Sequence, residues 1–259
     1  MSVSQVKSAV RALEIMEYFR SVKQSRSMSE ISTVLNYPQS STTVLLKTLV
    51  SSGYLNFNRT ERLYFPTLKL YDLGNWIPSS IFSSELVLDV LQDIHDKTGE
   101  TVSITTKNDI YVQYNKIIHS VHALRYHVSE SELRPLTQSS AGWLLMSTMN
   151  DKALDNTIRR ANSVTQQEGY RVDITEMMER IRQIREQGYS CTGNLPFQGS
   201  GTISVLAPIS IHGQPVTIGI GGELQRIKQN FDSYLDLLRT GVKRLENNSN
   251  FHLPIEITM

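Results

Sequence analysis

The stretch from Pro38 to Gly53 carries the signals of one short helix and constrains what can surround it. Proline suits the first turn of a helix, and glycine can end a helix in a left-handed conformation. Leu45, Leu46 and Leu49 form one apolar stripe along this predicted helix. The outward side chains are small or polar and include no acid: Gln39, Ser40, Ser41, Thr43 and Lys47. Such a face can enter a groove of DNA without repelling the phosphates.

Helical patterns precede this stretch, and strand patterns follow it. Apolar residues recur every three or four positions in residues 5–21, which predicts an amphipathic helix. Ser27 and Glu30 have the spacing of a capping box at the start of a second helix. Strand-like runs at 54–57 and 63–65 enclose a polar, basic turn. Three helices followed by a β-hairpin is the order of a winged helix-turn-helix, whose third helix enters the major groove of DNA.

A small helical bundle that only packs on another domain would show the same order of elements. The charge distribution favours a nucleic-acid partner instead. Residues 1–80 hold nine lysines and arginines against five acids, a net charge of +4, whereas the rest of the chain has a net charge of −3. This asymmetry suits a nucleic-acid module joined to a neutral or acidic domain.

The composition is that of a globular chain long enough for two domains. The 259 residues are 39% apolar and 20% charged. Cys191 is the only cysteine, which excludes an intrachain disulfide and a thiolate metal cluster. The N-terminus lacks the basic start and apolar run of a signal peptide, and no run approaches the roughly 18 apolar residues that span a bilayer. We therefore expect a cytoplasmic protein without a membrane partner.

The chain after residue 80 alternates helix and strand patterns, as in a mixed α/β domain. Helices are predicted near 86–97, 150–161, 173–187 and 228–246, and strands at 101–106, 110–114, 201–209 and 216–222. Residues 115–135 have no clear period, and we expect strand or loop there.

His119, His122 and His127 lie close together in that stretch and invite a metal interpretation, since imidazole is a common zinc ligand. Their spacing fits no helical zinc signature. Ordinary loop and pocket histidines are the preferred interpretation, so no metal is expected.

Catalytic motifs are also missing from the sequence. It contains no Gly-x-Ser-x-Gly elbow and no phosphate loop, and residues 219–222 lack the full glycine spacing of a dinucleotide site. We expect no enzymatic activity and no cofactor. The competing interpretation is a small-molecule-binding or enzymatic protein whose N-terminal domain serves only oligomerisation.

Several short runs share one further pattern: residues 8–13, 29–31, 38–41, 45–49, 53–55 and 70–74, together with Tyr64. These runs resemble the IclR family of bacterial transcription regulators. Val44 departs from the family, because many members carry arginine there, and an apolar side chain suits a thymine methyl group. Pro66 and Thr67 replace the usual Leu-Gly after the wing.

The resemblance implies an α+β fold with three parts. Residues 1–66 would form the winged helix-turn-helix DNA-binding domain, residues 67–80 a linker helix, and residues 81–259 an effector-binding domain. The last part would be a mixed α/β domain with a curved antiparallel sheet, similar to GAF and PAS domains.

For the DNA-binding part, the resemblance and the polar face imply these contact residues: Gln39, Ser40, Ser41, Thr43, Val44, Lys47, Arg59 and Arg62. Those at 39–44 would meet base edges, Lys47 would hold phosphate, and the two wing arginines would grip the backbone or minor groove. A homodimer or homotetramer would present two such helices to a palindromic double-stranded operator.

For the effector part, the resemblance implies a small organic or aromatic acid as ligand, in a regulator or repressor of catabolic genes. The expected pocket residues are Ser140, Ala141, Thr192, Thr202, Ser204, Gly219 and Gly221. Small residues at 139–142 can also cap a helix and leave its first N–H groups open to an anion. Ligand binding would shift the population of dimer or tetramer geometries.

Overall fold

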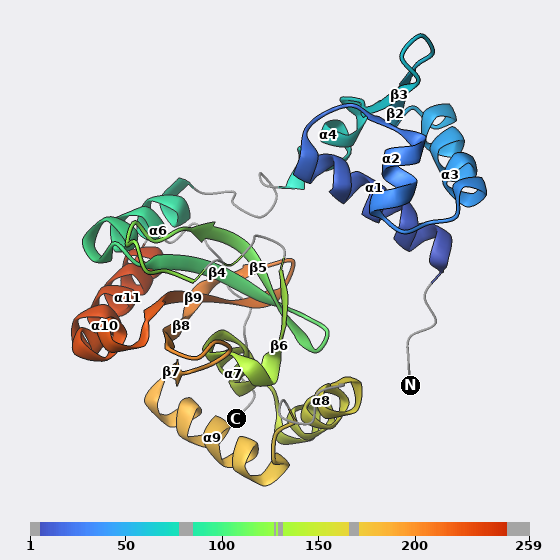
Figure 1. Cartoon of the computed structure of the whole chain (residues 1–259). Helices are drawn as coiled ribbons and strands as arrows, with labels where there is room; N and C mark the ends of the chain where they lie inside the picture. Colours follow the sequence, from blue (N-terminus) through green and yellow to red (C-terminus); the bar gives the residue numbers. More distant parts are fainter. Residues whose placement is uncertain (1–5, 78–84, 127, 129–131, 166–170, 248–259) are drawn as a thin grey trace. The chain divides into compact units, whose positions relative to one another are not determined.

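The computed structural model describes the chain apart from residues 1–5, 78–84, 127, 129–131, 166–170 and 248–259 (Figure 1). The chain divides into two compact units, Ser2–Ser83 and a second that begins at Ser84. Each unit has its own core and is described by itself.

The N-terminal unit is a helical cluster with a small sheet. Its helices are α1 (Lys7–Val22), α2 (Met28–Val34), α3 (Gln39–Ser51) and α4 (Lys69–Gly74), and its strands are β1 (Arg26–Ser27), β2 (Leu55–Asn58) and β3 (Leu63–Pro66). The strands pair antiparallel in the order β1-β3-β2. Ile15, Phe19, Ile31 and Leu46 meet at the centre, so that α1, α2 and α3 share one core. This is the predicted winged helix-turn-helix arrangement.

The ends of α2 and α3 explain why these helices lie where the sequence predicted. The capping box is confirmed: the Ser27 N–H donates to the Glu30 carboxylate at 2.8 Å, and the Glu30 N–H donates to the Ser27 hydroxyl at 3.3 Å. Helix α3 ends at Ser51, and Gly53 turns the chain away after it with a φ of +79°. The Tyr54 N–H reaches back to the Leu49 carbonyl at 2.9 Å, as in a Schellman motif.

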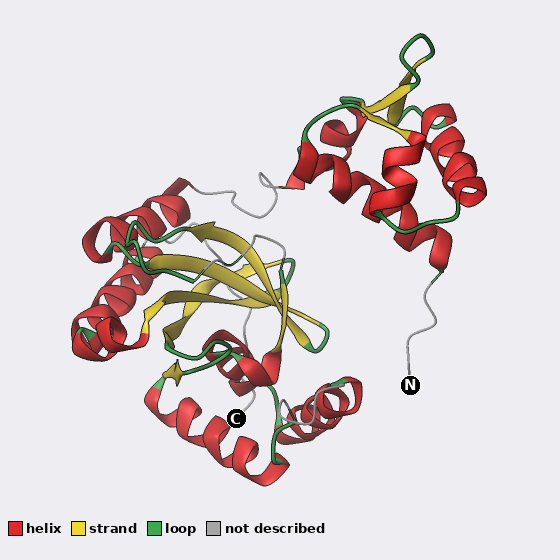
Figure 2. Cartoon of the chain, in the orientation of Figure 1, coloured by secondary structure: helices red, strands yellow, loops and turns green. Residues whose placement is uncertain are grey.

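The C-terminal unit is built on one curled antiparallel sheet (Figure 2). Its strands are β4 (Thr101–Asn108), β5 (Tyr111–Ile118), β6 (Leu133–Pro135), β7 (Tyr189–Gly193), β8 (Ser200–Ile211) and β9 (Gln214–Glu223). Their order across the sheet is β6-β5-β4-β9-β8-β7. The helices are α6 (Glu85–Thr98), α7 (Ser140–Ser147), α8 (Asp151–Val164), α9 (Ile174–Gln187), α10 (Leu224–Gln229) and α11 (Phe231–Glu246), with a 3₁₀ turn, η1, at Leu136–Gln138.

The two faces of this sheet differ in chemistry because strand residues alternate between them. One face is aliphatic and is covered by α6, α10 and α11 (Figure 1). Its buried residues include Val102, Ile104, Ile203, Val205, Ile218 and Ile220. The other face lies toward α7 and carries mostly hydroxyl groups and glycines. That second face holds the cavity described below.

The structure and the predicted elements differ near the C-terminus and beside β8, and the predicted linker is only partly described. The final helix, predicted at about 228–246, is α11, which begins at Phe231 after the N-cap residue Asn230 and ends at Glu246. The short helix α10 before it was not predicted, and Glu223 caps it by accepting from the N–H groups of Gln225 and Arg226. Strand β7, at Tyr189–Gly193, was not predicted, and it extends the sheet beside β8. Of the predicted linker at 67–80, the structure describes α4 and the residues to 77, and residues 78–80 lie outside the described part.

Candidate nucleic-acid interface and ligand cavity

The exposed face of α3 holds the residues expected to contact DNA. Gln39, Ser40, Val44 and Lys47 are exposed, whereas Ser41 and Thr43 are partly buried. Val44 is 64% exposed, although it is aliphatic and sits in a helix with a buried apolar stripe. An aliphatic side chain on this face can contact a thymine methyl group in the major groove.

The hydroxyl groups of this face already make bonds within the helix. Ser41 donates to the carbonyl of Pro38 at 2.9 Å, and Thr43 donates to the carbonyl of Gln39 at 2.8 Å. These bonds occupy the hydroxyl hydrogens and leave oxygen lone pairs for a base or a water molecule.

Arg11, which the sequence did not single out, supports the start of α3. Its guanidinium lies 4.7 Å from the centre of the Tyr37 ring and donates to the Ser41 hydroxyl at 3.4 Å. The Tyr37 hydroxyl in turn donates to Glu14. Helix α1 therefore helps to orient the first turn of α3.

The turn between β2 and β3 carries the two arginines expected on the wing. Both are exposed, and Arg62 has a φ of +58°. Asn58 shapes the turn, because its side-chain oxygen accepts from the N–H groups of Thr60 at 3.0 Å and Glu61 at 3.2 Å. Between the two arginines, Glu61 accepts a hydrogen bond from the Asn58 side-chain amide at 2.9 Å.

A cavity in the second unit lies between the hydroxyl-bearing face of the sheet and the start of α7. The space between them, counted together with the open solvent at its mouth, is about 660 Å³. Its lining includes Thr101, Ser103, Tyr114, Ile117, Tyr126, Arg134, Ser139, Ser140, Ala141, Phe197, Thr202, Ser204, Gly219 and Gly221. Six of the seven expected pocket residues are among these, and only Thr192 is not.

Thr192 stands behind the cavity wall. Its hydroxyl bonds that of Thr202, its partner across β7 and β8. Thr202 also accepts from the Ser140 hydroxyl at 3.0 Å, and Ser140 and Ser204 share a bond of 2.8 Å. The cavity therefore contains one neutral, connected hydroxyl cluster, formed by Ser140, Thr202 and Ser204.

Two glycines keep the floor of the cavity clear. A Cβ atom on Gly219 would lie 2.8 Å from the Ser204 hydroxyl, and one on Gly221 would lie 3.0 Å from Thr202 Cγ2. Both contacts are shorter than ordinary van der Waals distances. The glycines provide the space in which a ligand could lie against the hydroxyl cluster.

Helix α7 begins at the cavity. The Ser139 hydroxyl caps it by accepting from the Gly142 N–H at 3.0 Å. Gly142 packs directly on η1, since a Cβ atom there would lie 2.1 Å from the Leu136 carbonyl oxygen. The positive end of the helix dipole therefore faces the hydroxyl cluster, an arrangement that favours an oxygen-bearing ligand.

An arginine and several aromatic side chains complete the cavity, and the sequence did not indicate them as site residues. Arg134 on β6 is only 7% exposed. Its guanidinium lies 5.7 Å from the centre of the Tyr114 ring and 5.4 Å from that of Phe197. Phe197 stacks on Tyr126 at 5.8 Å with nearly parallel rings. Burial is the main cause that raises the pKa of Tyr114, so its hydroxyl stays protonated at neutral pH.

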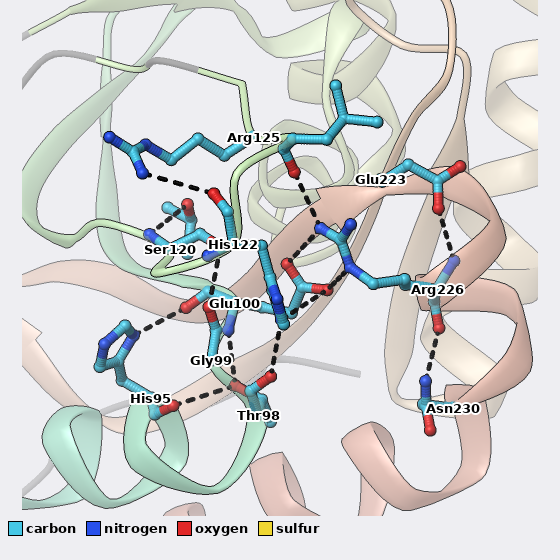
Figure 3. A network of polar contacts seen from close by, with 12 residues as sticks. His95, Thr98, Gly99, Glu100, Ser120, His122, Arg125, Glu223, Arg226 and Asn230 are labelled. Atoms are coloured by element: carbon cyan, nitrogen blue, oxygen red, sulfur yellow. Dashed lines mark hydrogen bonds and ion pairs between the residues drawn. The ribbon is translucent and has the colours of Figure 1, made fainter.

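A polar network supports this unit beside the cavity (Figure 3). Glu100 is fully buried and accepts two hydrogen bonds from Arg226, at 2.6 and 3.1 Å. Arg226 also donates to the carbonyl of Leu124 at 3.1 Å. Gly222 makes room for the carboxylate, because a Cβ atom at that position would lie 2.3 Å from a Glu100 oxygen.

The histidines belong partly to this network. His122 Nε2 lies 3.3 Å from the Thr98 carbonyl and 3.8 Å from Glu100 (Figure 3). His127 lies outside the described residues. Within the described residues, no three His, Cys, Asp or Glu side chains are grouped as a metal site requires. In the same part of the chain, every helix is too short or too polar to cross a membrane.

A helix-turn-helix unit followed by a separate unit that contains a cavity is the domain order of one class of protein, the DNA-binding transcription regulators with an effector domain. Residues 8–59 match the IclR helix-turn-helix domain, and residues 84–247 match the C-terminal domain of the bacterial transcriptional regulator IclR. The chain belongs to the IclR family of bacterial transcription regulators. The matched families and relatives are regulators and not enzymes.

Two curated relatives come from Escherichia coli K12. HTH-type transcriptional regulator XynR is 24% identical over 77% of this chain and 79% of its own length. Transcriptional repressor IclR is 21% identical over 73% of this chain and 70% of its own length.

Solved structures show the same fold. The effector domain of a transcriptional regulator IclR from Acinetobacter sp. ADP1 is 63% identical, with a TM-score of 0.62, over 65% of this chain and 98% of that one. An IclR homologue from Microbacterium hydrocarbonoxydans, solved in complex with 4-hydroxybenzoate, is 15% identical, with a TM-score of 0.68, over 93% of this chain and 98% of that one.

Proposed function

We propose that this regulator controls catabolic genes by binding a palindromic operator and that a small organic or aromatic acid, bound in the cavity beside α7, changes this binding. The observation that carries the proposal is the cavity itself. A neutral hydroxyl cluster, the start of a helix and aromatic side chains converge there, and the same chain bears a helix-turn-helix unit.

The face of α3 would read the operator. Gln39 and Ser40 are exposed at its first turn, and Val44 would meet a thymine methyl group. The hydroxyl oxygens of Ser41 and Thr43 would accept from base amino groups or bridging water, because their hydrogens are already engaged. Three basic residues would hold the DNA backbone or minor groove: Lys47, Arg59 and Arg62.

The cavity would hold the effector. The hydroxyl cluster of Ser140, Thr202 and Ser204 would bond a polar group of the ligand, with Ala141 beside it and Gly219 and Gly221 leaving room for it. Thr192 would support the cluster from behind. The aromatic acid bound by the Microbacterium homologue is consistent with this choice of ligand.

A second copy of the chain would complete the regulator as a homodimer or homotetramer. Apolar side chains are exposed after the wing, including Leu68 at 80%, Tyr71 at 68% and Leu73 at 60%. Within the described part of the N-terminal unit these side chains are too exposed to belong to its core, and exposed apolar clusters mark interaction sites. Repression is the mode we propose, in line with the name of the Escherichia coli relative.

Binding of the full-length protein to its own promoter region tests the proposal. We expect sequence-specific retardation of a palindromic site, with an affinity that falls steeply as salt rises. A thermal-shift screen of organic acids should give hits that also alter operator binding. Gly221→Phe should abolish those hits, because the ring would fill the cavity. If the protein showed only weak, sequence-independent DNA binding, the N-terminal unit would serve oligomerisation instead.

A further inference from the structure

The lining of the cavity contains neutral hydroxyl groups and one charged guanidinium, and these come from different elements of the fold. The hydroxyl cluster lies on α7 and β8, whereas Arg134 lies on the edge strand β6. Among the described residues that line the cavity, Arg134 is the one with a permanent charge. A ligand with one anionic and one neutral polar group therefore meets a different partner for each.

Arg134 is buried, and one of its nitrogens bonds a carboxylate of this chain while its other N–H groups remain for a second acceptor. Its side chain is 8% exposed, and its Nη2 donates to Glu132 at 2.7 Å. Glu132 is itself 35% exposed. A guanidinium carries N–H groups on two nitrogens besides the one that bonds Glu132. Its planar fork matches the two oxygens of a carboxylate better than any other side chain does.

The aromatic side chains around Arg134 favour a ligand with a ring. Tyr114 and Phe197 flank the guanidinium, and Tyr126 stacks on Phe197. The Tyr126 hydroxyl donates to the carbonyl of Gln198 at 2.9 Å, which fixes this ring at the cavity wall. A flat ligand can pack on such rings by offset stacking or edge contacts.

We infer that Arg134 binds the carboxylate of the effector, so that a single-ring aromatic acid lies with its carboxylate at β6 and a ring hydroxyl at the cluster of Ser140, Thr202 and Ser204. This assignment rests on the proposed function and gives the ligand an orientation. The hydroxyl cluster is neutral and internally bonded, and it suits a phenolic hydroxyl better than a second carboxylate.

Paired probes that differ only in charge test this orientation in the full-length protein. Isothermal titration would compare 4-hydroxybenzoate with 4-hydroxybenzamide, which has the same shape without the charge. We expect the wild-type protein to bind the acid at least about tenfold more tightly than the amide, because charge-assisted bonds are about twice as strong as neutral ones. Arg134→Gln should remove most of this preference, because it should weaken binding of the acid much more than binding of the amide. Arg134→Lys should keep part of the preference.

Glu132→Gln is the matched variant, and it should change the preference for the acid over the amide in the opposite direction. It removes the carboxylate that shares Arg134, so the preference for the acid over the amide should rise above that of the wild-type protein. If Arg134 had only a structural role, its substitution would instead lower the affinity for both probes by a similar factor. Thermal unfolding without ligand checks that each variant is folded.

Two results would overturn the inference and leave the proposed function standing: an equal affinity of the wild-type protein for both probes, or an unchanged preference in both Arg134 variants. Binding that survives Gly221→Phe would overturn the proposed cavity. Binding of neither probe to the wild-type protein would overturn the inference, and the proposed function would fall with it only if the thermal-shift screen of organic acids also gave no hit.

Discussion

Arg226 and Glu100 form a two-point ion pair in which the carboxylate is fully buried and the guanidinium is 26% exposed. The same guanidinium bonds the Leu124 carbonyl, so one arginine joins the start of β4, the loop after β5 and helix α10. The bond to Glu100 is also the main cause that raises the pKa of Arg226.

Removal of this arginine should destabilise the effector domain strongly. We expect Arg226→Met to lower its free energy of unfolding by about 3 to 5 kcal/mol, because Glu100 would remain buried without its cation. Urea unfolding followed by circular dichroism measures the loss. Arg244→Met is the matched control: Arg244 pairs with Asp93 at 3.1 Å, but both side chains are substantially exposed, and such pairs contribute about 0 to 1 kcal/mol. Equal losses in the two variants would contradict this interpretation.

Ser190 should be replaceable at no cost. It is fully buried, and its hydroxyl has no hydrogen-bond partner among the described residues. An unmatched buried hydroxyl costs about 1 to 3 kcal/mol of desolvation, so Ser190→Ala should leave the midpoint of thermal unfolding unchanged or raise it. Ser204→Ala, which removes a hydroxyl bonded to Ser140, should lower it. A lower midpoint for Ser190→Ala would show that a bound water satisfies the group.

Two substitutions on α3 should affect DNA binding in different ways. Lys47→Ala should weaken binding to all sequences and reduce the salt slope by about 1, because it removes a phosphate contact. Gln39→Ala should cost about 1 to 3 kcal/mol on the operator and little on unrelated DNA, because it removes a base contact. Fluorescence anisotropy at several salt concentrations separates the two effects. Identical behaviour of both variants would exclude these separate roles.

Acid should weaken the start of α10 through Glu223. Its carboxylate accepts from the N–H groups of Gln225 and Arg226, and these backbone bonds lower its pKa from the ordinary value of 4.5. A lowered pKa gives stability that is present above pH 4.5 and is lost as the pH falls through the folded-state pKa. Glu223→Gln should therefore show a flatter stability profile below pH 4.5. Thermal unfolding at several pH values measures both profiles. A steeper loss of stability below pH 4.5 in Glu223→Gln than in the wild-type protein would contradict this prediction.

The N-terminal unit was predictable because its signals are local. The capping box at Ser27, the glycine at position 53 and the polar wing turn each act within a few residues, and together they set the order of elements. The short helix α10 was missed because Glu223 is an uncommon capping residue and a helix of six residues shows little apolar period.

The cavity was predictable only in part. The alternation of Thr202 and Ser204 with aliphatic residues shows two faces, and the family resemblance indicated which face meets a ligand. Arg134 and Phe197 come together only because the sheet curls and a loop returns over it. A pattern read along the chain contains no information on such contacts between distant segments.

The alternation along β8 and β9 separates two evolutionary constraints that share the same strands. Substitutions at Thr202, Ser204, Gly219 or Gly221 change the wall of the cavity, whereas those at Ile203 change the aliphatic face on the other side of the sheet. The lining of the cavity can therefore change by point mutation while the aliphatic core of the sheet stays the same. An insertion within either strand would do the opposite, since a shift of one residue would turn the aliphatic side chains into the cavity and the hydroxyl groups into the core.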